Sequence, residues 1–94
     1  MKYNTDYFIK KFKAIPSNRW TVNQYESGNK CCALGHCGAN DTKLLGDVPE
    51  ACALSILLDG DCASINDGLH HEYPQKTPRG RILAALKDAK KDNK

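Results

Sequence analysis

The chain has 94 residues, enough for one domain but too few for a dinucleotide-binding fold with a separate substrate domain or for a (β/α)₈ barrel. Apolar residues make up 40% of it and charged residues 27%, which is typical of a folded globule rather than a disordered tail. The net charge of +3 is unevenly spread. Residues 1–13 hold four lysines and one aspartate, residues 76–94 hold seven basic and two acidic residues, and residues 14–75 hold three basic and eight acidic residues. We predict a single compact domain over residues 1–94, with basic ends around an acidic centre.

The sequence contains no membrane-spanning stretch, because no run approaches about 18 consecutive apolar residues. Lysines at positions 10, 11 and 13 interrupt the apolar core that a signal peptide needs. The five cysteines are odd in number and come without an export signal, which favours reduced thiols over a disulfide framework. We therefore expect a cytoplasmic protein with no membrane partner.

Apolar residues at helical spacing predict a first helix over residues 5–15, with Asn4 or Thr5 as its cap and Pro16 beyond its end. Its apolar stripe consists of Tyr7, Phe8, Phe12 and Ile15.

The next segment predicts a β-hairpin. Residues 20–25 are rich in β-formers, Gly28-Asn29 is a hairpin-turn signal, and residues 30–34 form the return strand. The alternative for the end of this segment is a short helix that begins at Ala33. A hairpin alone is marginal, so we expect helices to cover its apolar face. The residues predicted for that face are Trp20, Val22 and Leu34.

After a predicted loop over residues 38–46, a second helix is predicted from a capping-box-like pair, Asp47 and Glu50, with Pro49 in the first turn and a stop at Gly60. Its apolar stripe consists of Ala51, Leu54, Leu57 and Leu58. Residues 62–65 predict a short strand, followed by a turn over residues 66–68.

A last helix begins at Pro78 with Thr77 as its cap, and we expect residues 92–94 to fray. Its apolar face consists of Ile82, Leu83, Leu86 and Ala89. The pattern as a whole predicts an α+β fold, with about three helices packed on a small antiparallel β-hairpin or sheet.

Cysteine and histidine give two chemical hypotheses. A structural zinc ion would need four ligands, for which the candidates are Cys32, His36, Cys37 and His70. A cysteine nucleophile would use Cys32 or Cys37, with His70 or His71 as the base and Asp67 to orient it. Neither set has a family-specific spacing, so we expect buried cysteines, no catalytic activity and no cofactor.

The basic ends raise a third hypothesis, phosphate binding by one patch on the two terminal helices. The candidates are Lys10, Lys11, Lys13, Arg79, Arg81 and Lys87. The alternative, which we favour, is that these residues form the solvated faces of two amphipathic helices.

Several short motifs recur in a known group of sequences. They are Trp20, Gly28, Cys31-Cys32-Ala33-Leu34-Gly35, Ala51, Ala53-Leu54, Ile65-Asn66-Asp67 and a closing helix rich in leucine. Together they resemble small uncharacterised bacterial and phage proteins with a Trp-Cys hairpin, a Cys-Ala-Leu-Gly segment and an Asn-Asp turn. This chain departs from the pattern at Thr21, where a cysteine often follows the tryptophan. The resemblance implies a compact α+β unit, in which Ala33-Leu34-Gly35 packs the hairpin onto a helix and Asn66-Asp67 makes a turn. It implies no established activity.

These observations favour a small non-enzymatic accessory protein, from a bacterium, a phage or a mobile element, that binds a protein or a small ligand. The segregated charge would orient such a partner. The alternatives are a cysteine-dependent hydrolase or transferase and a nucleic-acid-binding protein. The enzyme requires cysteine and histidine in one concave pocket, and the nucleic-acid binder requires a contiguous basic face.

Overall fold

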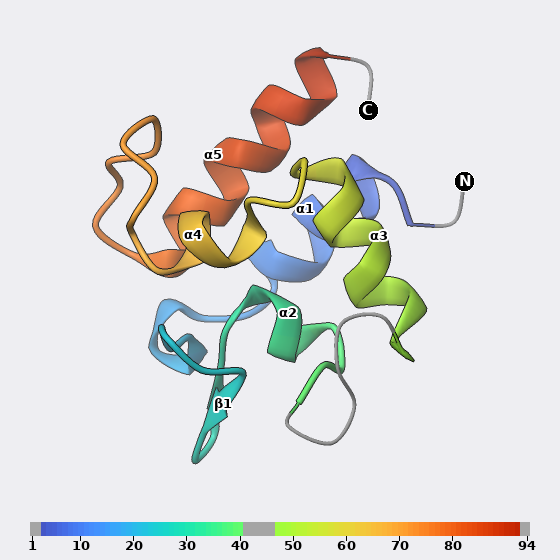
Figure 1. Cartoon of the computed structure of the whole chain (residues 1–94). Helices are drawn as coiled ribbons and strands as arrows, with labels where there is room; N and C mark the ends of the chain where they lie inside the picture. Colours follow the sequence, from blue (N-terminus) through green and yellow to red (C-terminus); the bar gives the residue numbers. More distant parts are fainter. Residues whose placement is uncertain (1–2, 41–46, 93–94) are drawn as a thin grey trace.

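A computed structural model describes residues 3–40 and 47–92 of the chain (Figure 1). Within them it contains five α-helices and a two-stranded antiparallel sheet, so the α+β class is as predicted. In chain order the elements are α1 (Thr5–Lys13), a 3₁₀ turn η1 (Ser17–Arg19), β1 (Glu26–Ser27), β2 (Lys30–Cys31), α2 (Ala33–His36), α3 (Pro49–Leu57), α4 (Cys62–Asn66) and α5 (Pro78–Lys91). Most of the predicted loop, residues 41–46, and the last two residues of the predicted frayed end lie outside the described residues.

The two terminal helices pack side by side in antiparallel orientation, and α1 makes its most extensive contacts with α5. Near the start of α1, Asp6 accepts a hydrogen bond from Lys90 at 2.7 Å. At the other end, the Arg79 guanidinium donates to the carbonyl oxygens of Lys13 and Ile15 at 3.0 and 3.1 Å. Arg79 thereby pairs the Lys13 carbonyl group, which has no partner within α1, and its charge suits the helix dipole.

The described residues form one hydrophobic core, which lies where the helices meet. Phe8 and Phe12 from α1 are fully buried, as the predicted stripe requires. The apolar faces predicted for the second and the last helix are also buried: Ala51, Leu54, Leu57 and Leu58, and Ile82, Leu83, Leu86 and Ala89. Helical periodicity therefore identified the inner faces of all three long helices.

The caps confirm two predicted helix starts and correct a third. Asn4 accepts from the Tyr7 amide at 2.9 Å, and Thr77 accepts from the Gly80 amide at 3.0 Å. The predicted capping box of Asp47 and Glu50 is wrong: Val48 is the N-cap of α3, and it makes no side-chain cap. The Glu50 carboxylate is bound to α1 instead, so a tertiary contact replaces the local one.

The predicted β-hairpin is present but much shorter than the sequence suggested. Its strands have two residues each, and residues 22–25 form a bend before the first strand (Figure 1). The return segment enters α2 at Ala33, as the alternative prediction had it. Trp20 and Leu34 are buried in the core, although neither lies in a strand, and Val22 is only half-buried. The core is therefore mostly helical, with the sheet at its edge.

The predicted strand over residues 62–65 is wrong, because this segment forms helix α4. Gly68, at φ +79°, follows the end of α4. The buried Arg81 guanidinium donates to the carbonyl oxygens of Ile65 at 3.0 Å, Asn66 at 2.7 Å and Gln75 at 2.9 Å. A five-residue helix is unstable by itself, so the cap that α5 supplies is what specifies this conformation.

We expect Arg81→Met to lower the free energy of unfolding by about 2–4 kcal/mol, since three carbonyl groups lose charge-assisted hydrogen bonds. Methionine retains much of the apolar stem, which isolates the loss of the guanidinium. Urea unfolding followed by circular dichroism measures the change. Lys87→Met, at an exposed position of the same helix, should stay within about 0.5 kcal/mol of the wild type. Equal effects of the two substitutions would contradict the capping role.

Candidate functional site

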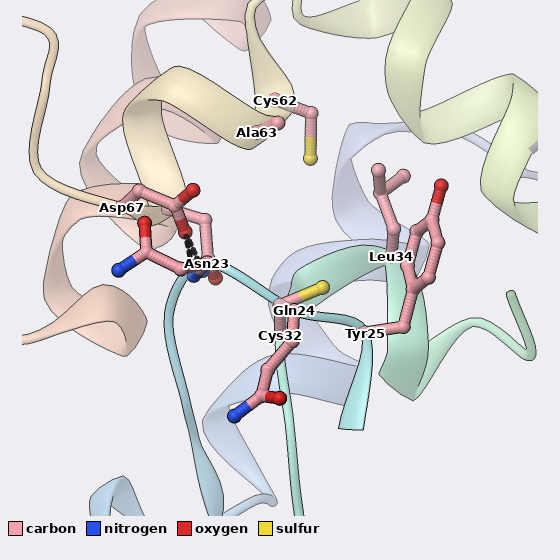
Figure 2. Close-up of a pocket in the computed structure, with 9 residues that line it drawn as sticks. Asn23, Gln24, Tyr25, Cys32, Leu34, Cys62, Ala63 and Asp67 are labelled. Carbon is pink, nitrogen blue, oxygen red and sulfur yellow. Dashed lines mark hydrogen bonds between the residues drawn. The ribbon is translucent and has the colours of Figure 1, made fainter. Parts of the chain in front are cut away.

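A cavity of about 310 Å³ lies between residues 23–25, α2 and α4 (Figure 2). Figure 2 shows Asp67 and Asn23 on one side of it and Leu34 and Tyr25 on the other. Its lining consists of Asn23, Gln24, Tyr25, Cys32, Leu34, Cys62, Ala63, Asn66 and Asp67. The cavity thus joins a polar rim to an apolar wall, the usual make-up of a small-ligand site.

Asn66 holds the three segments around the cavity together. Its side chain is 1% exposed, and its Oδ1 accepts from the Ala33 amide at 3.0 Å. Its Nδ2 donates to the Thr21 carbonyl oxygen and to the Asp67 Oδ1, both at 3.0 Å. The residue that the sequence placed in a turn is therefore a buried link between α4, α2 and the segment before the hairpin.

Asp67 is fixed at the rim of the cavity with one of its oxygens available. Its Oδ1 accepts from the Asn23 backbone amide at 2.9 Å and from Asn66. Asn23 has φ +66°, in the left-handed region that asparagine tolerates better than most residues. The other carboxylate oxygen of Asp67, Oδ2, accepts no hydrogen bond from the part of the chain that the structure describes. The carboxylate is held in place and keeps an acceptor for an incoming donor.

Two thiols face the same cavity from opposite elements. Cys32 is the N-cap residue of α2, where its sulfur accepts from the Gly35 amide at 3.4 Å, and Cys62 opens α4. Cys32 is 8% exposed and Cys62 is 1% exposed. Burial raises the pKa of both thiols above the ordinary cysteine value. Both are therefore protonated at neutral pH, which makes them poor nucleophiles.

No histidine lines this cavity, so the structure brings Cys32 and Asp67 together but leaves their predicted histidine partners elsewhere. His36 packs edge-on against Trp20, and burial lowers its pKa. His70 stacks on His71, and its Nε2 is 3.6 Å from the Asp61 carboxylate.

His70 belongs to a second cavity, of about 280 Å³, which also holds Tyr73. Burial and a hydrogen bond to Asp88 raise the pKa of Tyr73 to about 12. Five carboxylates line this cavity: Asp59, Asp61, Glu72, Asp88 and Asp92. Across residues 3–40 and 47–92, no three or more His, Cys, Asp or Glu side chains gather as metal ligands, so the four predicted zinc ligands are not assembled.

Cys37, the other candidate nucleophile, joins a polar cluster between α1, α2 and α3. Burial, and then the nearby Glu50 carboxylate, raise the pKa of its buried thiol. Glu50 accepts from Lys11 at 2.6 Å and from the Tyr7 hydroxyl. The bond to Glu50 and burial raise the pKa of Tyr7 to about 12. Burial opposes the ionisation of Glu50, but the hydrogen bonds from Lys11 and Tyr7 outweigh it and lower its pKa. This cluster ties α3 to the rest of the fold.

We expect Glu50→Gln to cost about 1–2 kcal/mol at neutral pH, because the charge-assisted bonds to Lys11 and Tyr7 weaken. A carboxyl group whose folded pKa is lowered contributes stability above its unfolded pKa and loses it as pH falls through the folded pKa. The stabilities of the wild type and the variant should therefore converge as pH falls below the lowered pKa of Glu50. Urea unfolding at neutral and acid pH measures this. Glu72→Gln, at an exposed glutamate, should leave the pH profile unchanged. If the difference in the free energy of unfolding between the wild type and Glu50→Gln is the same at all pH values, the ionic contribution of Glu50 is ruled out.

The six basic candidates do not share one environment. Lys10, Lys13 and Lys87 are exposed. The other three have intramolecular partners: Lys11 binds Glu50, Arg79 binds the end of α1, and Arg81 binds the end of α4. Three of the six are therefore committed to the fold.

Comparison of the chain with protein-family models, with curated proteins and with solved structures finds no match. None of the helices in the described residues is long and apolar enough to cross a membrane. Sequence reasoning missed the cavity residues Asn23, Tyr25, Cys62 and Asn66 as a group. One signal for them was available, since the motifs that begin at Trp20, Cys31 and Ile65 all reach this cavity.

Proposed function

We propose that this protein is a non-catalytic binding protein and that the cavity between residues 23–25, α2 and α4 is its binding site. The ligand is a small molecule, or a side chain of a partner protein, that joins an apolar body to a cationic amine. The observation that carries the proposal is the fixed Asp67 carboxylate at the rim of a cavity with an apolar wall; its Oδ2 accepts no hydrogen bond from residues 3–40 and 47–92.

The lining supports this ligand class. Tyr25, Leu34 and Ala63 offer apolar contact, and a volume of about 310 Å³ suits a small ligand or a single large side chain. Because Asn23 and Asn66 already fix the Asp67 carboxylate, a bound ammonium group would require little reorganisation. A cation is favoured over a neutral donor because its hydrogen bond to a carboxylate is the stronger one.

The other two hypotheses have less support. A cysteine hydrolase or transferase needs an activated thiolate, whereas Cys32 has a raised pKa and no histidine in its cavity. Lys11, Arg79 and Arg81 are bound to partners within the fold, so they would not be available to a surface that binds nucleic acid. The odd number of cysteines still favours a reducing compartment, so we place the protein in the cytoplasm.

The test is a titration with benzylamine, with neutral benzyl alcohol as the matched probe, followed by two-dimensional ¹H–¹⁵N NMR. Benzylamine should shift the amide signals of residues 23–25 and Ala63, and benzyl alcohol should bind about tenfold more weakly. Asp67→Asn keeps an acceptor for the Asn23 amide but removes the charge, and it should abolish this preference.

Asp61→Asn is the matched control, because Asp61 lines the second cavity. It should leave benzylamine binding unchanged. The proposal fails if the amine produces no shifts around the cavity, or if Asp67→Asn binds both probes as the wild type does.

A further inference from the structure

The cavity contains a pair of thiols that the proposed function does not use. Cys32 and Cys62 lie 30 positions apart in the sequence but line one cavity. Figure 2 shows their sulfur atoms pointing into the space between α4 and α2. The other cysteines are placed differently: Cys37 is buried, Cys31 and Cys52 are half-buried, and none of the three lines either of the two cavities.

We propose that Cys32 and Cys62 form a two-thiolate site for a soft monovalent metal ion, with Cu(I) as the ion the chemistry favours. This inference is independent of amine binding at Asp67. Thiolates are soft ligands and select Cu(I) over the hard cations that carboxylates prefer. The two sulfurs lie on opposite elements, so an ion between them would bridge α2 and α4.

The number of donors selects among the thiophilic ions. Structural zinc takes four ligands, and no group of three or more ligating side chains exists among the described residues. Cu(I) is stable with two thiolates in a linear arrangement, so two sulfurs suffice. The Asp67 carboxylate at the rim is a hard oxygen ligand, which suits neither this ion nor its geometry.

The burial of the two sulfurs suits a low-coordinate ion. Both side chains are more than nine-tenths buried, and Leu34 and Ala63 line the same cavity. Each of the two cysteines is therefore only slightly exposed to water. The Gly35 amide already donates to the sulfur of Cys32 and would stabilise its thiolate when the proton leaves.

Binding is a proton exchange without a redox step. Two thiols and one Cu(I) ion give a bis-thiolate complex of net charge −1 and release two protons. Because burial raises the pKa of both thiols, both protons are present at neutral pH and must be displaced. The apparent affinity should therefore rise by about 100-fold per pH unit near neutrality.

The test is an anaerobic titration of the whole protein with Cu(I) buffered by bathocuproine disulfonate, whose absorbance reports the metal that it retains. The wild type should take up one equivalent of Cu(I). Native mass spectrometry should show the mass of one copper ion added and of two protons lost. Cys32→Ser and Cys62→Ser should each bind at least about 100-fold more weakly. Cys52→Ser is the matched control, since Cys52 is a half-buried cysteine of α3, and it should bind as the wild type does.

X-ray absorption of the copper-loaded wild type provides a readout that needs no variant, and it should show two sulfur neighbours and no nitrogen. The proposal is overturned if the wild type fails to compete with the chelator, if either serine variant retains full affinity, or if the absorption spectrum shows nitrogen ligands. Benzylamine titration of the same metal-free protein reports on Asp67 separately, so the two proposals fail independently.

Discussion

Replacing Gly35 with alanine is expected to lower the free energy of unfolding by more than about 3 kcal/mol. A Cβ atom built on Gly35 would lie 2.0 Å from the backbone oxygen of Tyr25 and 3.1 Å from the Cβ of Cys31. The nearest atom is backbone, so no side chain can rotate away to make room. The same Tyr25 oxygen accepts from the Cys32 amide at 3.0 Å, so displacing it would also break that bond. Guanidinium unfolding followed by tryptophan fluorescence measures the loss.

Gly60→Ala is the control for this experiment. Gly60 has φ +84° and no atom within 4 Å of a built Cβ, so alanine there meets only the backbone cost of about 1 kcal/mol. The difference between the two variants isolates the steric overlap at Gly35. A loss of stability in Gly35→Ala no larger than that in Gly60→Ala would contradict the close approach of α2 to the Tyr25 backbone.

Asn66→Ala should destabilise the protein by about 2–5 kcal/mol, because it leaves the Ala33 amide and the Thr21 carbonyl without partners. It also removes the contact that positions the Asp67 carboxylate. Amide hydrogen exchange should therefore accelerate at Ala33 by more than the global loss of stability explains. Chemical denaturation provides the global value for comparison.

Gln24→Ala separates the role of Asn66 from a general sensitivity of the cavity. Gln24 lines the same cavity but is exposed, so its removal should change stability by less than about 0.5 kcal/mol. Unchanged exchange at Ala33 in Asn66→Ala would show that this link does not hold the cavity together.

The long terminal helices were predictable because their signals are local. Asn4 and Thr77 cap the helices that follow them, and the stripes containing Phe8 and Leu86 repeat at helical spacing. Each of these signals spans a few residues, so a single sequence carries it in full.

The errors fall where distant residues decide the local conformation. Helix α4 depends on Arg81 from α5, and the capping role predicted for Glu50 was replaced by its bonds to Lys11 and Tyr7. The segment after Trp20 alternates like a strand, but its backbone is held by Asn66 from α4. No local pattern records partners separated by 16 to 45 positions.

The candidate site was predictable only in part. Cys32 and Asp67 were both among the predicted site residues, and the structure places them in the lining of one cavity. The histidines expected beside them do not line this cavity. The sequence could not predict this, because the spacing between a cysteine and a histidine along the chain does not determine their distance in the fold. The cavity forms where three segments meet, and hydrogen bonds of the buried Asn66 fix that meeting.

The antiparallel pairing of α1 with α5 also constrains how the protein acquires its fold during synthesis. Phe8 and Phe12 leave the ribosome early, yet the helix that α1 contacts most extensively begins at Pro78. The nascent chain therefore exposes two aromatic side chains until nearly the whole domain has emerged. Closing a loop of this length costs entropy before any contact compensates for it. Folding should be late and cooperative, and nascent chains stalled before α5 should bind chaperones that recognise exposed hydrophobic segments.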